Sequence, residues 1–192
     1  MYDLFNSFIR KLFPQCRIDR ILVEPLLKLK NLDRGEFLFQ EGDVCSFVGL
    51  TKRGCLRSFI LKDGKELTLF FHPENYTLGD YESLRRQKPA CFSCQAIEDS
   101  EVLIIDIRVI KVLESEPDGQ KLLRLIVEDL AFGLRDRLFS IYRDSVEERY
   151  LNLIKNEPQL IQRIPQYYLA SYLNIEPESL SRLKRRIDKK KT

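Results

Sequence analysis

The sequence lacks the features that mark membrane proteins, metalloproteins and many enzymes. No apolar run approaches the roughly 20 residues that a membrane-spanning helix needs, and the chain has one histidine, His72. A metal site of the zinc or cupin type takes several histidine or carboxylate ligands, so we interpret His72, beside Pro73, as a solvated loop residue. Phosphate loops and dinucleotide fingerprints are missing too. These absences predict a protein that is not an enzyme and uses no cofactor or metal.

Cysteine is sparse and odd in number. The N-terminal stretch MYDLFNSFIRKLF alternates like an amphipathic helix and has no signal-peptide core. An odd set of thiols without a secretion signal predicts reduced cysteines and a cytoplasmic protein. The Cys91-x-x-Cys94 pair has no second pair to complete a zinc site, and we expect Cys94 to pack inside a strand. The five cysteines are Cys16, Cys45, Cys55, Cys91 and Cys94.

Positive charge is concentrated at one end of the chain. Hydrophobic residues make up 44% and charged residues 32% of the 192 residues, which is typical of one large or two small globular domains. The formal net charge is +3, yet residues 182–192 alone hold seven Lys/Arg and one Asp, so the remainder is net negative. Such a concentration suits a polyanionic partner, and a solvated, frayed terminus is the alternative.

Helical patterns at the N-terminus give way to short strands. Residues 3–30 have a helical pattern interrupted by Pro14 and Pro25. From Leu32 onward, short alternating runs separated by glycines predict a small all-β barrel or roll. The clearest hairpin is CLRSFILK-DG-KELTLFF, because Asp63-Gly64 suits a two-residue turn with positive φ angles. Further strands are expected near residues 92–96 and 102–107.

A long amphipathic helix is predicted from about residue 118. Its apolar residues recur at spacings of four, three, four, four and three, which makes one continuous seam. A second apolar row lies around the side, so the helix must bury two faces. One face can cover the roll, and the other either meets a second copy of the chain or lies between two domains of one chain. We favour the dimer. The seam comprises Leu123, Val127, Leu130, Leu134, Leu138 and Ile141, and the second row comprises Leu122, Ile126, Phe132 and Phe139.

The C-terminal segment has the pattern of two helices joined by a tight turn. A short helix over residues 145–156 ends before Pro158, and Pro165 suits the first turn of the next helix. Asn174 tolerates the left-handed conformation of a tight turn, Ile175 fills the space beneath it, and Pro177 starts the second helix. The inward set is Leu169, Ala170, Leu173, Leu180, Leu183 and Ile187, and the outward set is Glu178, Arg182, Arg185 and Lys189. This arrangement predicts a helix–turn–helix whose second helix enters the major groove of DNA.

The outward residues have the chemistry of base and phosphate contacts. Arginine reads guanine through two hydrogen bonds, and glutamate accepts from cytosine. Glu178 and Arg182 are four residues apart and can pair in the free protein. Lys184, Arg186 and the terminal lysines are placed for phosphates. The alternative is an ordinary helical hairpin with a basic surface. The candidate DNA-binding residues are Gln166, Glu178, Ser179, Ser181, Arg182, Lys184 and Arg185.

Five segments carry a wider resemblance: GEFLFQEGD, RGCLRSFILKDGKELTLFF, GDYESL, AIEDSEVLIID and IPQYYLASYLNIEPESLSRLKRRI. Through them the chain resembles the Crp/Fnr family of bacterial transcription regulators. It implies an α+β fold: an antiparallel, jelly-roll-like β-roll with flanking helices (residues 1–117), a long dimerisation helix (118–143) and a C-terminal helix–turn–helix domain (144–192). It also implies a homodimer on a pseudo-palindromic operator, a Glu-x-x-x-Arg reading pair that falls on Glu178 and Arg182, and an effector site in the roll.

The effector site departs from the family pattern. Nucleotide-binding members carry a Gly-Glu pair and, about ten residues later, an arginine that neutralises the cyclic phosphate. Here the pair is Gly79-Asp80, and Ala90 followed by Cys91 takes the arginine's place. A buried phosphate without a counter-charge is costly, so we expect no cyclic-nucleotide binding. Arg85 and Arg86 lie nearby, but a solvated turn is the simpler interpretation for them. The chain also ends at Thr192, too soon for the family's β-hairpin wing, and the lysine tail is expected to supply those backbone contacts.

The sequence thus predicts a DNA-binding transcription regulator with a degenerate nucleotide pocket. The predicted partners are double-stranded DNA, a second copy of the chain, a small-molecule effector of unknown identity and RNA polymerase, with no membrane. One alternative is a ligand-sensing or protein-interaction module whose basic tail contacts RNA or another acidic partner. Another is a small cupin-like enzyme, which would require a bound metal.

Overall fold

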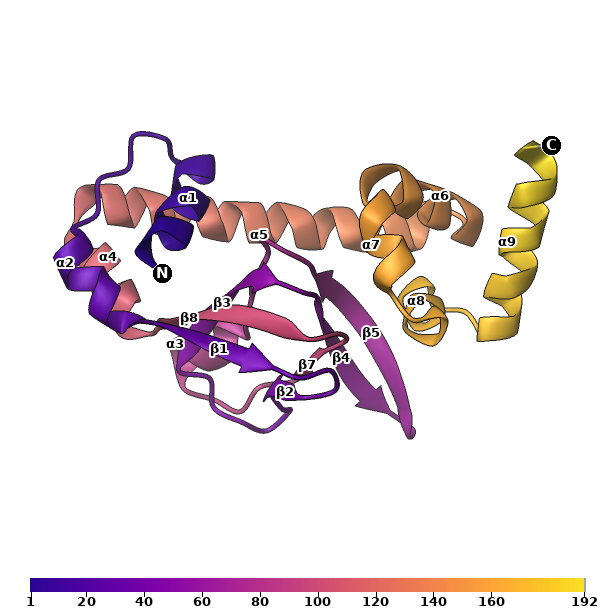
Figure 1. Ribbon diagram of the computed structural model, residues 1–192, viewed down its shortest axis with the longest axis horizontal. Helices are drawn as coiled ribbons and strands as arrows, with labels where there is room; N and C mark the ends of the chain where they lie inside the picture. The colour runs from indigo at the N-terminus through magenta and orange to yellow at the C-terminus, as the bar shows by residue number, and fades with distance from the viewer. Residues whose placement is uncertain (192) are drawn as a thin grey trace.

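Two antiparallel four-stranded sheets form the body of the protein. The computed structural model describes residues 1–191, and Figure 1 shows the sheets packed beneath a long helix. The first sheet has the order β1 (Leu27–Leu32), β8 (Ser100–Asp106), β3 (Phe47–Arg53), β6 (Thr77–Leu78). The second has the order β2 (Phe37–Phe39), β7 (Ser93–Ala96), β4 (Leu56–Lys62), β5 (Lys65–His72). The predicted antiparallel roll is confirmed.

The turn between β4 and β5 has the predicted geometry. Lys62 pairs with Lys65 across it, and Asp63 and Gly64 adopt φ angles of 52° and 75°. Both central residues of this two-residue hairpin therefore have positive φ, which matches the right-handed twist of the flanking strands. The hairpin leaves β5 as an edge strand of its sheet.

The N-terminal region is only partly helical, and the prediction for residues 27–30 was wrong. Helix α1 spans Tyr2–Leu12, a short α2 spans Arg20–Val23, and a 3₁₀ turn, η1, covers Glu24–Leu26. The chain then enters β1, which pairs with β8 along its whole length. The run Leu-Lys-Leu-Lys after Pro25 alternates with a period of two, and the proline separates it from the preceding helix.

The long helix α5 (Pro117–Arg143) runs alongside the roll and on toward the C-terminal helices (Figure 1). It follows α4 (Arg108–Ser115), and a third helix, α3 (Tyr81–Arg86), lies between β6 and β7. The N-terminal part of α5 packs on its own chain, where Leu122 is fully buried. The central and C-terminal parts project their apolar side chains outward.

The second apolar row predicted on α5 does not form one face. Leu122 and Ile126 pack into the core formed with α1 and α4, whereas Phe132 and Phe139 are both 54% exposed. Phe132 follows Ile126 by six residues, which is about 240° around the helix at 100° per residue. The two phenylalanines therefore lie on a different side from the residues that contact the roll.

Four helices follow α5 in the part of the chain that the structure describes. Helix α6 (Val146–Asn156) starts at a capping box formed by Ser145 and Glu148, and α7 (Pro158–Arg163) is a short helix that the sequence analysis did not predict. Helices α8 (Gln166–Leu173) and α9 (Pro177–Lys191) end the chain. The C-terminal helices share their core with the roll. Cys55, Phe71 and Ile97 of the roll belong to the same buried cluster as residues of α7, α8 and α9.

His72 is not the solvated loop residue that was predicted. It is the last residue of β5 and pairs with Leu56 of β4. Its ring lies 2.8 Å (Nε2) from Ser58 Oγ and 3.1 Å (Nδ1) from the Thr77 carbonyl. The prediction failed because the following proline resembles a loop boundary, although the strand continues up to it.

The cysteines are all free thiols, as predicted. Cys94 lies fully buried in β7, and burial raises its pKa to about 12. Within residues 1–191, no helix combines the length and apolar character needed to cross a membrane.

Candidate nucleic-acid interface and effector site

The turn between α8 and α9 has the conformation predicted from its sequence. Asn174 is left-handed, with φ 58° and ψ 47°, and its N–H donates to the carbonyls of Ala170 and Ser171. The N–H of Ile175 also donates to the Ala170 carbonyl, at 3.0 Å. Asparagine accepts this conformation more readily than other side chains do. The turn therefore ends α8 sharply and directs the chain into α9, which begins at Pro177.

Helix α9 divides into a buried and an exposed face. Leu180, Leu183 and Ile187 are at most 6% exposed and join the core of the C-terminal helices. The predicted outward residues Glu178, Arg182, Arg185 and Lys189 are all exposed. The buried face fixes the helix on the protein body, and the basic face is presented to the surroundings. We refer to helices α8 and α9 with their turn as the α8–α9 pair.

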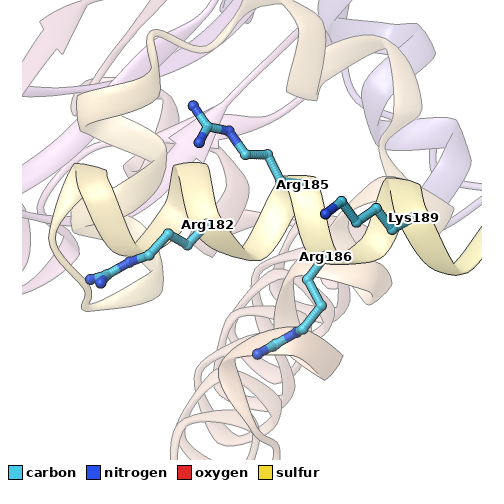
Figure 2. Close-up of a pocket in the computed structure, with 4 residues that line it drawn as sticks. All are labelled: Arg182, Arg185, Arg186 and Lys189. Carbon is cyan, nitrogen blue, oxygen red and sulfur yellow. The ribbon is translucent and has the colours of Figure 1, made fainter.

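Four cations line a shallow hollow along α9. Figure 2 shows Arg182, Arg185, Arg186 and Lys189 extending from this one helix. Arg186 also pairs with Glu147 of α6, Nη2 to Oε2 2.6 Å. From the sequence, Arg186 was expected to contact phosphate and was not grouped with the other three. A concentration of guanidinium and ammonium groups on one helix face suits an anionic partner.

Arg182 does not pair with Glu178 in this structure. Its Nη2 donates to Ser179 Oγ at 3.3 Å, and no ion pair joins Arg182 to Glu178 within the described residues. Glu178 lies in the first turn of α9, where a carboxylate is favoured by the helix dipole. Both side chains are therefore available at the surface without being held to one another.

The remaining candidates lie on or beside the same pair of helices. Gln166 is exposed at the start of α8, Ser181 is exposed on α9, and Ser179 is half-buried. Lys184 is also half-buried, with its ammonium 6.0 Å from the Tyr150 ring centroid. The predicted roles of Lys190, Lys191 and Thr192 concern side chains that lie outside the described residues.

The apolar seam of α5 is uncovered in the single chain. Its members from Val127 to Ile141 are between 39% and 51% exposed, whereas Leu123, closer to the roll, is half-buried. A row of aliphatic side chains at heptad-like spacing is a surface that normally packs against another helix.

The predicted effector residues lie together at the start of α3. Asp80 is only 6% exposed and caps this helix, with Oδ1 accepting the Ser83 N–H at 2.9 Å. Its other oxygen, Oδ2, accepts the Cys91 N–H at 3.2 Å and lies 3.7 Å from the Cys91 thiol. Burial and the neighbouring Asp80 carboxylate together raise the pKa of Cys91. The Asp80 carboxylate thus accepts hydrogen bonds from backbone N–H groups of two segments, α3 and the stretch before β7.

No cation enters this site from the neighbouring segments that the structure describes. Ala90 is buried, its N–H donating to the Asp43 carbonyl at 2.8 Å. Arg85 pairs with Glu114 at 2.7 Å, and Arg86 pairs with Glu82 at 2.9 Å, both at the surface. Both arginines are exposed, as predicted, but they lie in helix α3 and not in the solvated turn that was predicted.

Two arginines that the sequence analysis missed connect the roll to the C-terminal helices. Arg163 ends α7 and binds carboxylates of two roll loops. Arg57 of β4 is 1% exposed and its guanidinium carbon lies 3.6 Å from the Tyr168 ring centroid of α8. Neither position has a local sequence pattern that separates it from an ordinary surface arginine.

Comparison with known proteins gives a family match for the roll and a structural similarity for most of the chain. Residues 29–116, which comprise the roll with α3 between β6 and β7, match the family model of the cyclic nucleotide-binding domain. Most of the chain shares its fold with solved structures that include a regulator described as belonging to the Crp/Fnr family. A search of curated protein sequences gave no match.

Three solved structures illustrate the likeness. FixK2 from Bradyrhizobium japonicum has a TM-score of 0.72 and 17% identity, over 85% of this chain and 85% of that chain. A protein from Eubacterium rectale described as a Crp/Fnr-family transcriptional regulator scores 0.70 at 18% identity, over 89% and 82%. The c-di-GMP-responsive global regulator CLP of Xanthomonas campestris scores 0.67 at 16% identity, over 86% and 88%. The TM-scores establish a shared fold, and at identities this low they establish the fold alone.

Proposed function

We propose that this protein is a DNA-binding transcription regulator of Crp/Fnr type that binds a two-fold symmetric operator as a homodimer. The observation that carries the proposal is α9: one face is buried against the domain and the opposite face presents Glu178, Arg182, Arg185 and Lys189 after a left-handed turn at Asn174. The shared fold with regulators supports the same conclusion. In this proposal the α8–α9 pair is a helix–turn–helix.

The major groove of DNA accepts one α-helix, and the side chains of α9 suit that location. Arg182 can donate two hydrogen bonds to a guanine, and Glu178 can accept from a cytosine amino group. Arg185, Arg186 and Lys189 lie along the same helix and can neutralise phosphates. The two kinds of contact have different consequences: the first gives sequence preference, and the second gives salt-dependent affinity.

The uncovered seam of α5 supports a homodimer. Packing the seam of one chain on the same seam of a second copy removes its aliphatic side chains from water and creates an isologous two-fold interface. A two-fold dimer presents two copies of α9, and such pairs read half-sites about one helical turn of DNA apart. Contact with RNA polymerase remains a prediction without a surface assigned to it.

The geometry at Asp80 supports a roll that does not accept a cyclic nucleotide. The carboxylate takes the N–H groups of Ser83 and Cys91, and Ala90 offers no positive charge to a buried phosphate. Titration calorimetry with cyclic AMP should therefore give no saturable heat. Saturable binding at micromolar cyclic AMP would show that this part of the proposal is wrong.

Selection from a pool of random double-stranded DNA tests the central proposal. We expect enrichment of one two-fold symmetric motif and a steep fall in its affinity as salt is raised. A parallel selection from structured RNA addresses the alternative partner. Enrichment of an RNA motif, with no DNA motif at moderate salt, would favour the RNA-binding module and contradict the regulator.

A further inference from the structure

The edge of the second sheet is covered by α8 through hydrogen bonds that a neighbouring strand would normally make. The Thr68 N–H of edge strand β5 donates to Ser171 Oγ at 2.9 Å. The same hydroxyl donates to the Glu66 carbonyl at 2.8 Å. Open strand edges leave such groups exposed, and proteins commonly cover them. One serine side chain thus attaches α8 to the strand at both a donor and an acceptor.

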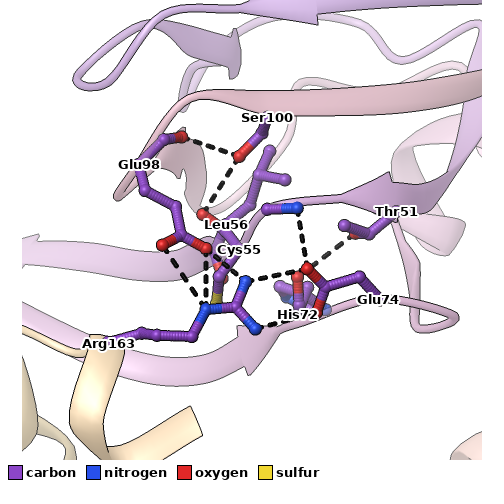
Figure 3. A network of polar contacts seen from close by, with 9 residues as sticks. Thr51, Cys55, Leu56, His72, Glu74, Glu98, Ser100 and Arg163 are labelled. Carbon is purple, nitrogen blue, oxygen red and sulfur yellow. Dashed lines mark hydrogen bonds and ion pairs between the residues drawn. The ribbon is translucent and has the colours of Figure 1, made fainter. Parts of the chain in front are cut away.

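A second connection is the ion-pair network around Arg163, shown in Figure 3. Its guanidinium lies between two carboxylates of the roll: Nη1 and Nη2 contact Glu74 at 2.9 and 2.8 Å, and Nε contacts Glu98 at 3.1 Å. The Gly54 N–H donates to Glu74 Oε1 at 2.9 Å. Burial raises the Glu74 pKa, but the hydrogen bonds from Arg163 and the backbone outweigh it and leave the pKa lowered. Glu74 is therefore held ionised toward Arg163.

A third connection is a stacked, buried arginine. The guanidinium carbon of Arg57 lies 4.0 Å from the Phe59 ring centroid on its own strand and 3.6 Å from that of Tyr168 on α8. Nη2 of Arg57 donates to Glu66 and Gln95. Its Nε and Nη1 atoms have no hydrogen-bond partner within the described residues, so the aromatic faces are what this buried charge gains in place of water. Losing Tyr168 would leave it without one of them.

The C-terminal end of α8 is also tied to the long helix. Arg137 of α5 donates to the Tyr172 carbonyl at 2.6 Å, and Arg149 of α6 donates to the Leu173 carbonyl at 2.9 Å. The α8–α9 pair is therefore fixed to the roll on one side and to α5 on another. We use the term docking interface for two sets of contacts. The first joins the C-terminal helices to the roll through Ser171, Arg163 and Arg57, and the second joins α5 to α8 through Arg137.

We propose that the docking interface fixes the orientation of α9 relative to α5 and thereby sets the half-site spacing that a dimer accepts. This inference rests on the proposed function. The basic face of α9 stays exposed while the interface is closed, so docking orients the reading face and does not cover it. A rigid attachment favours one distance between the two copies of α9, whereas a loosened pair would tolerate several distances at a higher entropic cost.

The main test variant is Arg163→Glu, which places a third carboxylate beside Glu74 and Glu98. Tyr168→Ala removes the ring from Arg57, and Glu74→Gln with Glu98→Gln removes the charges while keeping side-chain shape. Glu114→Gln is the matched control, because it removes a surface carboxylate from the Arg85 pair, remote from the docking interface. Circular dichroism checks whether each variant remains folded.

Two readouts separate the inference from the proposed function. Amide hydrogen exchange at Thr68, measured without DNA, reports docking directly, since this N–H is donated to Ser171. We expect at least a tenfold loss of protection in Arg163→Glu and none in Glu114→Gln. Duplexes carrying the selected half-sites, with the spacing changed by one and two base pairs, report orientation. The parent should prefer one spacing by tenfold or more, and variants that lose Thr68 protection should bind all spacings within about threefold.

The outcomes are distinct. A variant that loses Thr68 protection yet keeps the parent's spacing preference overturns the inference while leaving the proposed function in place. Unchanged Thr68 protection in all three docking variants also overturns it, because the contacts would then not hold the pair. A parent that binds no two-fold duplex overturns the proposed function itself.

Discussion

The imidazole of His72 is kept neutral by its position between the sheets. Burial lowers its pKa from the ordinary 6.5 to about 4, and its hydrogen bond with the Thr77 carbonyl opposes that shift only in part. In the unfolded chain the ring takes up a proton below about pH 6.5, so protons bind preferentially to the unfolded state between pH 6.5 and pH 4. The contribution of His72 to stability is therefore complete above pH 6.5 and is lost as the pH falls toward 4.

Replacing His72 by glutamine should flatten the acid side of the stability profile. From the shift in pKa, the parent should lose about 3 kcal/mol of its free energy of unfolding between pH 7 and pH 4 through this group alone. Denaturant unfolding at a series of pH values measures both proteins, and the difference between the two profiles isolates His72 from the carboxylates. Parallel profiles over this range would mean that the ring is not buried in its neutral form.

The residues whose roles could be predicted from the sequence were those with a left-handed backbone conformation. Asp63-Gly64 and Asn174 were assigned correctly, because glycine, asparagine and aspartate adopt positive φ angles with less strain than other residues do. Arg57 and His72 were not, because their roles depend on which distant segment packs against them. A basic residue in a strand resembles a surface residue until a neighbouring helix covers it.

At the scale of elements, the left-handed turn at Asn174 sets how α9 leaves α8. Asn174→Gly should keep the free energy of unfolding within a few tenths of a kcal/mol, because glycine adopts φ 58° without strain. Asn174→Ala should lower it by about 1 kcal/mol, because alanine lacks both the freedom of glycine and the polar side chain with which asparagine stabilises this conformation. Denaturant unfolding of both variants provides the comparison. Equal stability of the alanine and glycine variants would show that the residue is not left-handed in solution.

Elements with a long periodic pattern were predictable, and short ones were not. The seam of α5 extends over many turns and identified that helix almost to the residue. Helix α7 has six residues and strand β1 also has six, which is too few for periodicity to outweigh the neighbouring helical pattern. These short elements acquire their structure from tertiary pairing, β1 with β8 and α7 against the roll.

At the scale of the whole molecule, the seam of α5 should hold two chains together. Leu134→Glu places a charge within the seam and should shift the protein to a monomer. Phe132→Glu is the matched control: Phe132 is exposed as well but lies about 200° around the helix from Leu134. Sedimentation velocity at micromolar concentration measures the mass of each. A monomeric parent, or dissociation by Phe132→Glu and not by Leu134→Glu, would contradict this interface.

The order of parts along the chain was predictable from sequence, but their attachment was not. A roll, a long helix and a terminal helix pair follow one another as expected. The contacts of Ser171 and Arg163 with the roll join residues about 65 to 105 positions apart, and no local pattern predicts such pairs. The same holds for the Asp80 carboxylate, whose occupation of the Cys91 amide is visible only in the folded chain.

The most direct test of the central claim is the affinity of Arg182→Ala for the selected duplex and for a set of duplexes with single base-pair changes. Fluorescence anisotropy gives each dissociation constant, and Arg86→Ala, on α3, is the control for a lost surface charge. The proposed reading helix predicts a loss of about 1–3 kcal/mol, with discrimination relaxed at one base pair in each half-site and retained elsewhere. If Arg182→Ala bound every duplex with the parent's affinity and preferences, α9 would not be the helix that reads DNA.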